Sequence, residues 1–207
     1  LAGPQGCRSL LVVSTTPAEG KTITACNLAI VTAKRGLKTL LVDFDLRRPR
    51  VGRMFGINPQ SESLLHVLHQ QDPAAFARLP QETACKNLFV AGSRPSQDIS
   101  AAEVMGSHTV RDFLAWAQKN YDRVIVDSPP YGIVSDALAL AGLTGCLVLV
   151  CRPNKTRKRA TSHAIKRLAE AGANTLGVVV NDVDFRKGAF LSNYSYGLYV
   201  DYSSVNA

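Results

Sequence analysis

The sequence predicts a doubly wound α/β fold, in which a mainly parallel sheet is flanked by helices. Short apolar runs recur along the chain without alternating with polar residues, a pattern typical of strands buried on both faces of a sheet. Segments of helical character lie between these runs. Several runs end in a carboxylate, and ligands of such sheets bind at the carboxyl ends of the strands.

Each apolar run is expected to form one strand. The predicted strands cover residues 9–14, 38–43, 87–92, 123–127, 145–151 and 175–181.

Helices are expected between these strands. The segment 21–36 ends in Lys34, Arg35 and a glycine, which is a common helix stop. The segment 107–120 begins with Ser107 as a possible cap and places Phe113, Leu114 and Trp116 on a core-facing side. The segment 155–172 ends at Gly172.

The composition favours one sizeable domain. The chain has 207 residues, 46% of them hydrophobic, and no run reaches the roughly 20 apolar residues of a spanning helix. We therefore expect a soluble piece, although a membrane span could lie upstream of Leu1. The five cysteines show no pairing spacing, which predicts unpaired, buried thiols in a reducing cytosol.

Much of the formal charge of +8 is carried by two basic clusters. One comprises Arg47, Arg48, Arg50 and Arg53, and the other spans residues 152–167, which contain no acid. Such clusters suit phosphates, nucleic acid, anionic lipid or an acidic neighbouring subunit, while a solvated helix face is the alternative for the second.

A phosphate loop follows the first predicted strand. The stretch "STTPAEGKT" places Gly20, Lys21 and Thr22 at the start of a helix. There, backbone N–H groups attract phosphate, the lysine reaches the outer phosphates and the threonine hydroxyl ligates Mg²⁺. Thr15 stands where the full motif has glycine, so an ordinary strand-to-helix turn is the alternative.

Three aspartates close two of the other predicted strands. Asp43 and Asp45 flank Phe44 after one strand, and Asp127 ends another just before Pro129 and Pro130. Acids beside a phosphate loop repel one another unless a metal ion or a proton is present. Singly, each aspartate could instead cap a turn or a helix.

Together these stretches resemble a known family. "STTPAEGKT", "TLLVDFDLRRP" and "YDRVIVDSPP" look like the Walker A, A′ and B motifs of bacterial tyrosine kinases (BY-kinases), which are deviant-Walker P-loop NTPases. The tyrosine-rich end "NYSYGLYVDYSSVNA" resembles their C-terminal cluster. The implied organisation is a P-loop kinase domain over 1–190 and a flexible tyrosine-rich tail over 191–207.

The resemblance also implies roles for individual residues. The catalytic residues would be Lys21, Asp43, Asp45 and Asp127, with Asp45 as the base for the acceptor or its close partner. The metal ligands would be Thr22, Asp43 and Asp127. Contacts to ATP or ADP with Mg²⁺ would come from Thr16, Pro17, Ala18, Glu19, Gly20, Lys21, Thr22, Thr24 and, at the adenine, Asn181.

The implied activity is ATP-dependent autophosphorylation on tyrosine, regulating polysaccharide polymerisation and export. The phosphoacceptors would lie on the tail, because a core tyrosine cannot travel to an active site; they are Tyr194, Tyr196, Tyr199 and Tyr202. A short tether favours a neighbour's site, hence phosphorylation in trans. Packing of these tyrosines on a groove or a partner is the alternative.

Partners follow from the same resemblance. The chain would form a homo-oligomer, with a ring as one form, although the ExxRxxR helix that builds such rings is absent. It would meet a membrane polysaccharide co-polymerase region, in the same or a partner chain, at the cytoplasmic face of the inner or plasma membrane. No sequence-specific binding of nucleic acid is expected, because no DNA-reading motif is present.

Two other functions compete with this interpretation. A Min/Par-like positioning ATPase would use the same loop, but the early lysine of that group is missing and clustered phenols would serve no purpose. A catalytically idle scaffold would not need Lys21, Thr22 and the three aspartates.

Overall fold

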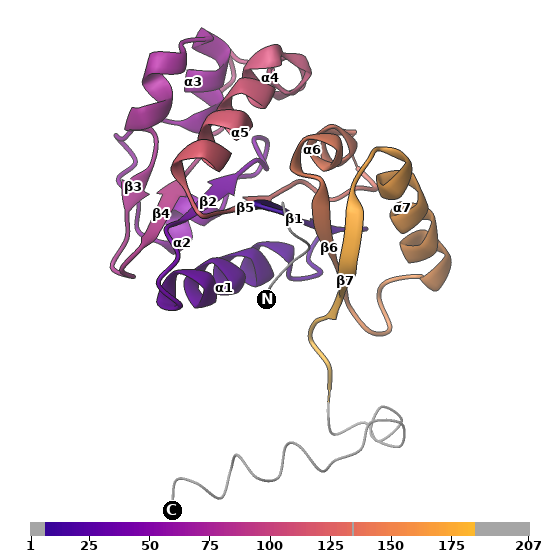
Figure 1. Cartoon of the computed structure of the whole chain (residues 1–207). Helices are drawn as coiled ribbons and strands as arrows, with labels where there is room; N and C mark the ends of the chain where they lie inside the picture. The colour runs from indigo at the N-terminus through magenta and orange to yellow at the C-terminus, as the bar shows by residue number, and fades with distance from the viewer. Residues whose placement is uncertain (1–6, 134, 185–207) are drawn as a thin grey trace, which may run out of the picture.

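The computed structural model describes residues 7–133 and 135–184, and these residues build the predicted α/β architecture (Figure 1). Within them a seven-stranded sheet has the order β3-β4-β2-β5-β1-β6-β7. All neighbouring strands are parallel except β3 and β4, which are antiparallel. The strands are β1 (Ser9–Ser14), β2 (Thr39–Asp43), β3 (Gln81–Glu82), β4 (Leu88–Ala91), β5 (Arg123–Asp127), β6 (Cys146–Cys151) and β7 (Asn174–Val180).

Helices cover both faces of the sheet. On one face lie α1 (Lys21–Lys34) and the short α2 (Val51–Met54), which pack on a small apolar cluster. The larger core lies on the opposite face, beneath α3 (Leu64–Gln70), η1 (Pro73–Arg78), α4 (Ala101–Gly106), α5 (His108–Asn120), α6 (Asp136–Thr144) and α7 (Lys158–Glu170). Burial of these apolar surfaces is the main force that holds the layers together.

The predicted strands and helices are confirmed, with small shifts at their ends. The core-facing side of α5 is also confirmed, since Phe113 and Leu114 are buried and Trp116 packs against them. Ser107 is the N-cap residue of α5, as predicted, but its side chain makes no capping hydrogen bond, because the hydroxyl donates to the Val104 carbonyl, 2.7 Å away.

The last strand departs from the prediction of strands buried on both faces. Leu176, Val178 and Val180 of β7 are exposed, because this strand lies at the edge of the sheet beyond the part that α1 covers. A continuous apolar run therefore indicated a strand here but not its burial.

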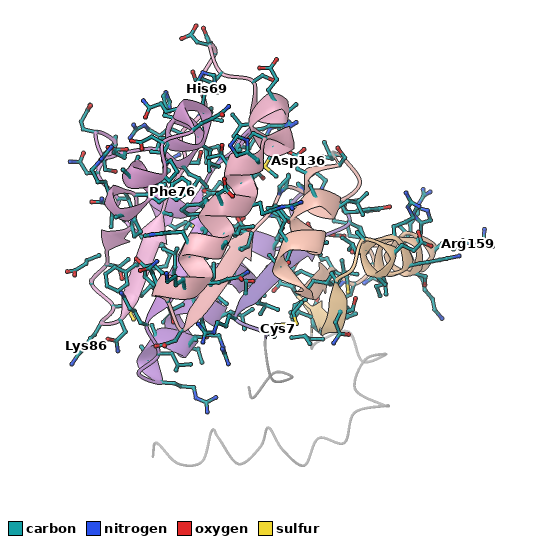
Figure 2. The ribbon with its side chains drawn as sticks, turned by 45° about the horizontal axis from the view of Figure 1, so that its top comes forward. Cys7, His69, Phe76, Lys86, Asp136 and Arg159 are labelled. Carbon is teal, nitrogen blue, oxygen red and sulfur yellow. A yellow bond between two sulfur atoms is a disulfide. The ribbon has the colours of Figure 1, made fainter. Side chains whose placement is uncertain are left out.

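The expectation that all cysteines are unpaired is also wrong. Cys7 and Cys146 form a disulfide across 139 residues, with their Cα atoms 6.3 Å apart (Figure 2 labels Cys7). Strand β6 runs beside β1, so tertiary structure brings together two cysteines whose sequence spacing gives no sign of pairing. Cys26, Cys85 and Cys151 are free, and Cys26 is buried.

No helix in the described part of the chain has the length and apolar character needed to cross a membrane.

Candidate active site

The carboxyl ends of β1, β2 and β5 meet at one edge of the sheet, because these three strands are direct neighbours. A cavity of about 520 Å³ opens there, between the loop after β1, the loop after β2 and the Pro129–Pro130 turn. Its lining includes Pro17, Ala18, Glu19, Gly20, Lys21, Thr22, Asp45, Arg47, Arg48, Arg50 and Ile133.

The loop between β1 and α1 has the backbone shape of an anion-binding turn. Ala18 and Gly20 adopt left-handed conformations, with φ of 61° and 93°, and α1 begins at the next residue, Lys21. Alternating backbone of this kind forms a concave nest of N–H groups, and the helix dipole adds positive charge at the same point. Glycine is favoured at position 20, because other residues rarely adopt a φ of 93° and because a Cβ there would meet the Asn181 side chain, 1.8 Å from its Nδ2.

Lys21 and Asp127 form a buried ion pair at the floor of this site. The Lys21 ammonium lies 2.5 Å from Oδ1 of Asp127, and the lysine is only 6% exposed. The Lys21 ammonium also lies 3.5 Å from the Thr22 hydroxyl. Burial raises the pKa of Asp127 above its usual range, and the charge of Lys21 opposes that rise.

Asp43 is enclosed at the end of β2. It is the register partner of Asp127 in the sheet and is 0% exposed. Its Oδ2 accepts hydrogen bonds from the backbone N–H groups of Arg50 and Val51, and its Oδ1 accepts one from Asp45. Burial, and next the charge of Asp127, raise the pKa of Asp43 to about 8.

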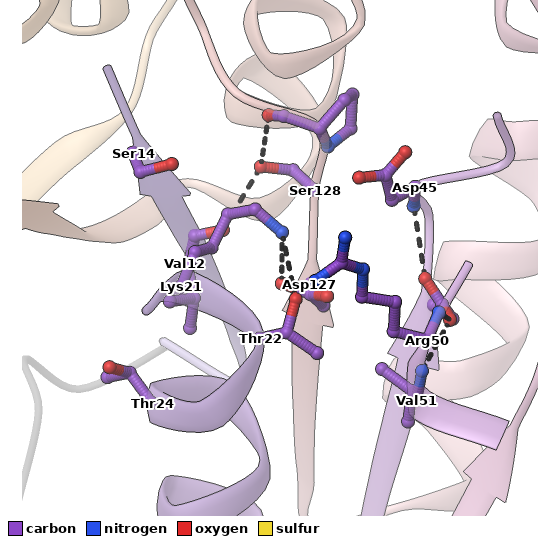
Figure 3. A network of polar contacts seen from close by, with 12 residues as sticks. Val12, Ser14, Lys21, Thr22, Thr24, Asp45, Arg50, Val51, Asp127 and Ser128 are labelled. Carbon is purple, nitrogen blue, oxygen red and sulfur yellow. Dashed lines mark hydrogen bonds and ion pairs between the residues drawn. The ribbon is translucent and has the colours of Figure 1, made fainter. Parts of the chain in front are cut away.

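Asp45 occupies a different environment. It lines the cavity and is half-buried, and its Oδ1 accepts a hydrogen bond from the Arg48 N–H, 3.1 Å away. Figure 3 shows Asp45 on the loop after β2, apart from the Lys21–Asp127 pair. Asp43, the last residue of β2, therefore holds the following loop together, whereas Asp45 lies in the lining of the cavity.

The residues present fit a divalent cation. Oδ2 of Asp127 is buried without a hydrogen-bond partner, and the hydroxyl of Thr22 lies beside the same Lys21–Asp127 pair. The buried carboxylates of Asp43 and Asp127 end neighbouring strands at the same register, and of these two Lys21 is paired with Asp127 alone, so added positive charge would stabilise them. Mg²⁺ prefers such oxygen ligands and binds through one or two carboxylates together with phosphates and water.

Three arginines complete the cavity, although motif spacing alone assigned none of them to it. Arg47 is anchored by an ion pair with the buried Asp136, at 2.8 Å. Arg48 and Arg50 also line the cavity, and Figure 3 shows the Arg50 side chain extending toward the Lys21–Asp127 pair. The sequence indicated these arginines only through the basic cluster of Arg47, Arg48, Arg50 and Arg53, a composition that suits phosphate binding.

Most of the predicted nucleotide-contacting residues lie at this cavity, but some have other bonds. Thr16 and Glu19 are hydrogen-bonded to each other, and Thr24 donates its hydroxyl proton to the Gly20 carbonyl. Asn181 donates from Nδ2 to the Glu19 carbonyl at 3.0 Å, so its contact with adenine stays a prediction. The four tail tyrosines and the boundary at 190/191 lie outside the described residues.

A phosphate-binding loop, a buried lysine and paired strand-end carboxylates define a P-loop nucleotide-binding protein. Comparisons agree with this class. The family model of the ParA: NUBPL iron-transfer P-loop NTPases matches residues 7–189. The tyrosine-protein kinase YwqD of Bacillus subtilis is 35% identical over 193 residues, which are 93% of this chain and 77% of YwqD.

Solved structures give the same result. The kinase domain of the Escherichia coli tyrosine kinase ETK superposes with a TM-score of 0.80 at 31% identity, over 92% of this chain and 72% of that one. MinD of Pyrococcus horikoshii shares the fold, with a TM-score of 0.72 at 21% identity, over 84% of this chain and 69% of that one. The chain belongs to the ParA-type P-loop NTPases and, within them, to the bacterial tyrosine kinases.

The buried carboxylates predict how stability responds to pH. In the metal-free protein burial raises the pKa of Asp43 to about 8, whereas in the unfolded chain the pKa is near 3.8. As pH rises through this window the unfolded state loses the proton first, so the free energy of unfolding should fall. Asp127 contributes with the same sign.

Chemical denaturation in EDTA at several pH values would measure this. The difference in unfolding free energy between the wild type and Asp43→Asn should shrink or reverse from pH 5 to pH 8, since asparagine does not titrate. A difference independent of pH would show that Asp43 does not carry a raised pKa.

Proposed function

We propose that the protein is an ATP- and Mg²⁺-dependent protein-tyrosine autokinase that phosphorylates a tyrosine cluster at its own C-terminal end. The observation that carries this proposal is the cavity in which the Lys21–Asp127 pair, the phosphate loop and the Asp45 carboxylate converge. The kinship with YwqD and with the ETK kinase domain supports tyrosine as the acceptor.

The loop after β1 binds the phosphates of the nucleotide. The N–H groups around Ala18 and Gly20 and the start of α1 receive the phosphates of ATP or ADP. Lys21 neutralises charge on the outer phosphates, and Arg48 and Arg50, which also line the cavity, add positive charge. Thr22, Asp127 and Asp43 would hold Mg²⁺, which when bound neutralises further phosphate charge; the buried Oδ2 of Asp127 supports this assignment.

Transfer requires an activated phenol. A tyrosine hydroxyl has a pKa near 10, so a positioned base is needed to remove its proton at neutral pH. Asp45 is the carboxylate that lines the cavity, and we assign it this role or close assistance in it. The phenol oxygen bonds to the γ-phosphorus, the bond from that phosphorus to the ADP oxygen breaks, and the phenol proton passes to Asp45.

The acceptors in this proposal are Tyr194, Tyr196, Tyr199 and Tyr202. Phosphorylation takes place in trans within a homo-oligomer, because a short tether restricts the tail from reaching its own cavity. The protein acts with a membrane polysaccharide co-polymerase region at the cytoplasmic face of the membrane and regulates polymerisation and export. The names of the relatives, which include ETK as a tyrosine kinase, support the kinase step only.

One experiment tests the proposal directly. The protein is incubated with ATP and Mg²⁺, and phosphotyrosine is mapped by mass spectrometry. We expect phosphate on the tail tyrosines and none on the variant in which all four are phenylalanine. A mass-tagged Lys21→Met chain mixed with wild type should become phosphorylated if transfer is in trans.

Two results would contradict the proposal. Hydrolysis of ATP without any phosphotyrosine would favour a positioning ATPase of the Min/Par type. Phosphate on wild-type chains alone, with the tagged Lys21→Met chain unmodified, would place transfer in cis.

A further inference from the structure

Glu19, inside the phosphate loop, carries a buried carboxylate that the mechanism above does not use. The residue is only 1% exposed. Its oxygens accept hydrogen bonds from the Thr15 hydroxyl at 3.1 Å and from the Thr16 N–H at 2.9 Å. The carboxylate therefore closes the loop on itself, between residues three and four positions apart.

Thr15 thereby gains a role that explains its presence. The strict phosphate-loop motif has glycine at this position, and here a threonine supplies the hydroxyl that binds Glu19. Thr15 is itself buried. The threonine that replaces the glycine of the motif is thus bonded to a side chain of the same loop, Glu19.

A second bond reaches Glu19 from outside the loop. The hydroxyl of Thr156 donates to Oε1 of Glu19, across 137 residues. The same hydroxyl accepts the Arg152 N–H at 2.8 Å, which fixes the turn between β6 and α7. Thr156 thus joins the phosphate loop to the turn that begins the basic segment 152–167.

Asn181 joins the same assembly after β7. Its backbone N–H donates to the Cys151 carbonyl at 2.8 Å, and its side chain donates to the Glu19 carbonyl. The loops after three neighbouring strands, β1, β6 and β7, therefore meet at Glu19. The described hydrogen bonds to the Glu19 carboxylate come from neutral donors, so its charge is held by hydrogen bonds rather than by a cation.

We propose that Glu19 and Thr156 are positioning residues that hold the phosphate loop in its nucleotide-binding shape. Ala18 and Gly20, which flank Glu19, both have positive φ, and this conformation is unfavourable for alanine. The hydrogen bonds to Glu19 fix the residue between Ala18 and Gly20. They therefore keep the backbone N–H groups of the loop pointing into the phosphate site before nucleotide binds. A preformed loop loses less conformational entropy on binding, so affinity rises.

The inference rests on the proposed nucleotide site, and binding of ADP tests it without requiring kinase activity. Thr156→Val removes the hydroxyl but keeps the shape of the side chain. Because hydrogen bonds to charged groups are among the stronger ones, we expect the Kd for fluorescent ADP with Mg²⁺ to rise roughly ten-fold. Thr156→Ser keeps the hydroxyl and should bind within about two-fold of wild type.

A double-mutant cycle distinguishes positioning from general damage. Glu19→Gln leaves one acceptor oxygen in place of two and should weaken ADP binding at least as much as Thr156→Val. If the two residues act through their shared bond, adding Thr156→Val to Glu19→Gln should cost little more. In transfer assays the KM for ATP should rise more than kcat falls, because the reacting groups are untouched.

The outcomes separate the two proposals. If wild-type protein does not bind ADP, the proposed function fails. If wild type binds ADP and folded Thr156→Val binds it equally well, or Thr156→Ser is as impaired as Thr156→Val, the positioning role is overturned. Melting curves of all variants establish that each is folded at the temperature of measurement.

Discussion

Replacing Lys21 with methionine should abolish tyrosine phosphorylation, with a loss of roughly a thousand-fold or more in rate. The ammonium is buried 2.5 Å from Asp127 at the floor of the cavity, where low dielectric strengthens its attraction to phosphate. Methionine fills a similar volume without charge. The fold should persist, because Asp127, whose pKa is raised by burial, can take up a proton.

Lys34→Met offers a matched control on the same helix. Lys34 is exposed in the last turn of α1, far from the cavity, and its loss should leave phosphorylation unchanged. Both variants are assayed with ATP and Mg²⁺ by mass spectrometry, and circular dichroism follows their folding. Full activity of Lys21→Met would remove the basis for placing the phosphates at this loop.

The second large effect separates Asp43 from Asp45. Asp45→Asn should lower the rate of transfer by about 10²- to 10⁴-fold, the usual contribution of a general base, while nucleotide still binds. Asp43→Asn should instead weaken Mg²⁺-dependent binding of ADP. Asp43 is enclosed and its oxygens accept three backbone N–H groups, whereas Asp45 lines the cavity.

Two assays on each variant decide this division. The Kd for ADP is measured with Mg²⁺ and with EDTA, and single-turnover transfer is measured at saturating ATP. Asp98→Asn, at an exposed position outside the cavity, serves as the control. Equal losses for Asp43→Asn and Asp45→Asn in both assays would mean that the two carboxylates act as one unit.

The parts of the candidate site that lie in short, local sequence motifs were predicted from the sequence. The stretch from Gly20 to Thr22 and the aspartates at the strand ends were assigned to one edge of the sheet, and they meet there. The reason is that parallel strands joined by helices present all their carboxyl ends on one side. The pattern could not show that Asp43 turns into the protein, since both aspartates have the same local context.

The sequence contains no local pattern that predicts contacts between distant segments. Thr156 reaches Glu19 across 137 residues, and Cys7 meets Cys146 across 139, because β6 is placed beside β1. Nothing in the sequence separation of either pair distinguishes it from other pairs of residues that do not touch. The three cavity arginines were visible only as a basic cluster, and the position of the loop after β2 assigned them to the phosphate site.

The sequence by itself determined the class of fold, the phosphate loop and the family, because apolar runs and motif spacings are local properties of the chain. The tertiary structure decided which carboxylate faces the cavity, which loops hold Glu19 and which face of β7 stays uncovered. These features depend on the order of the strands in the sheet. Strand order is settled by burial of the whole core, to which every segment contributes at once.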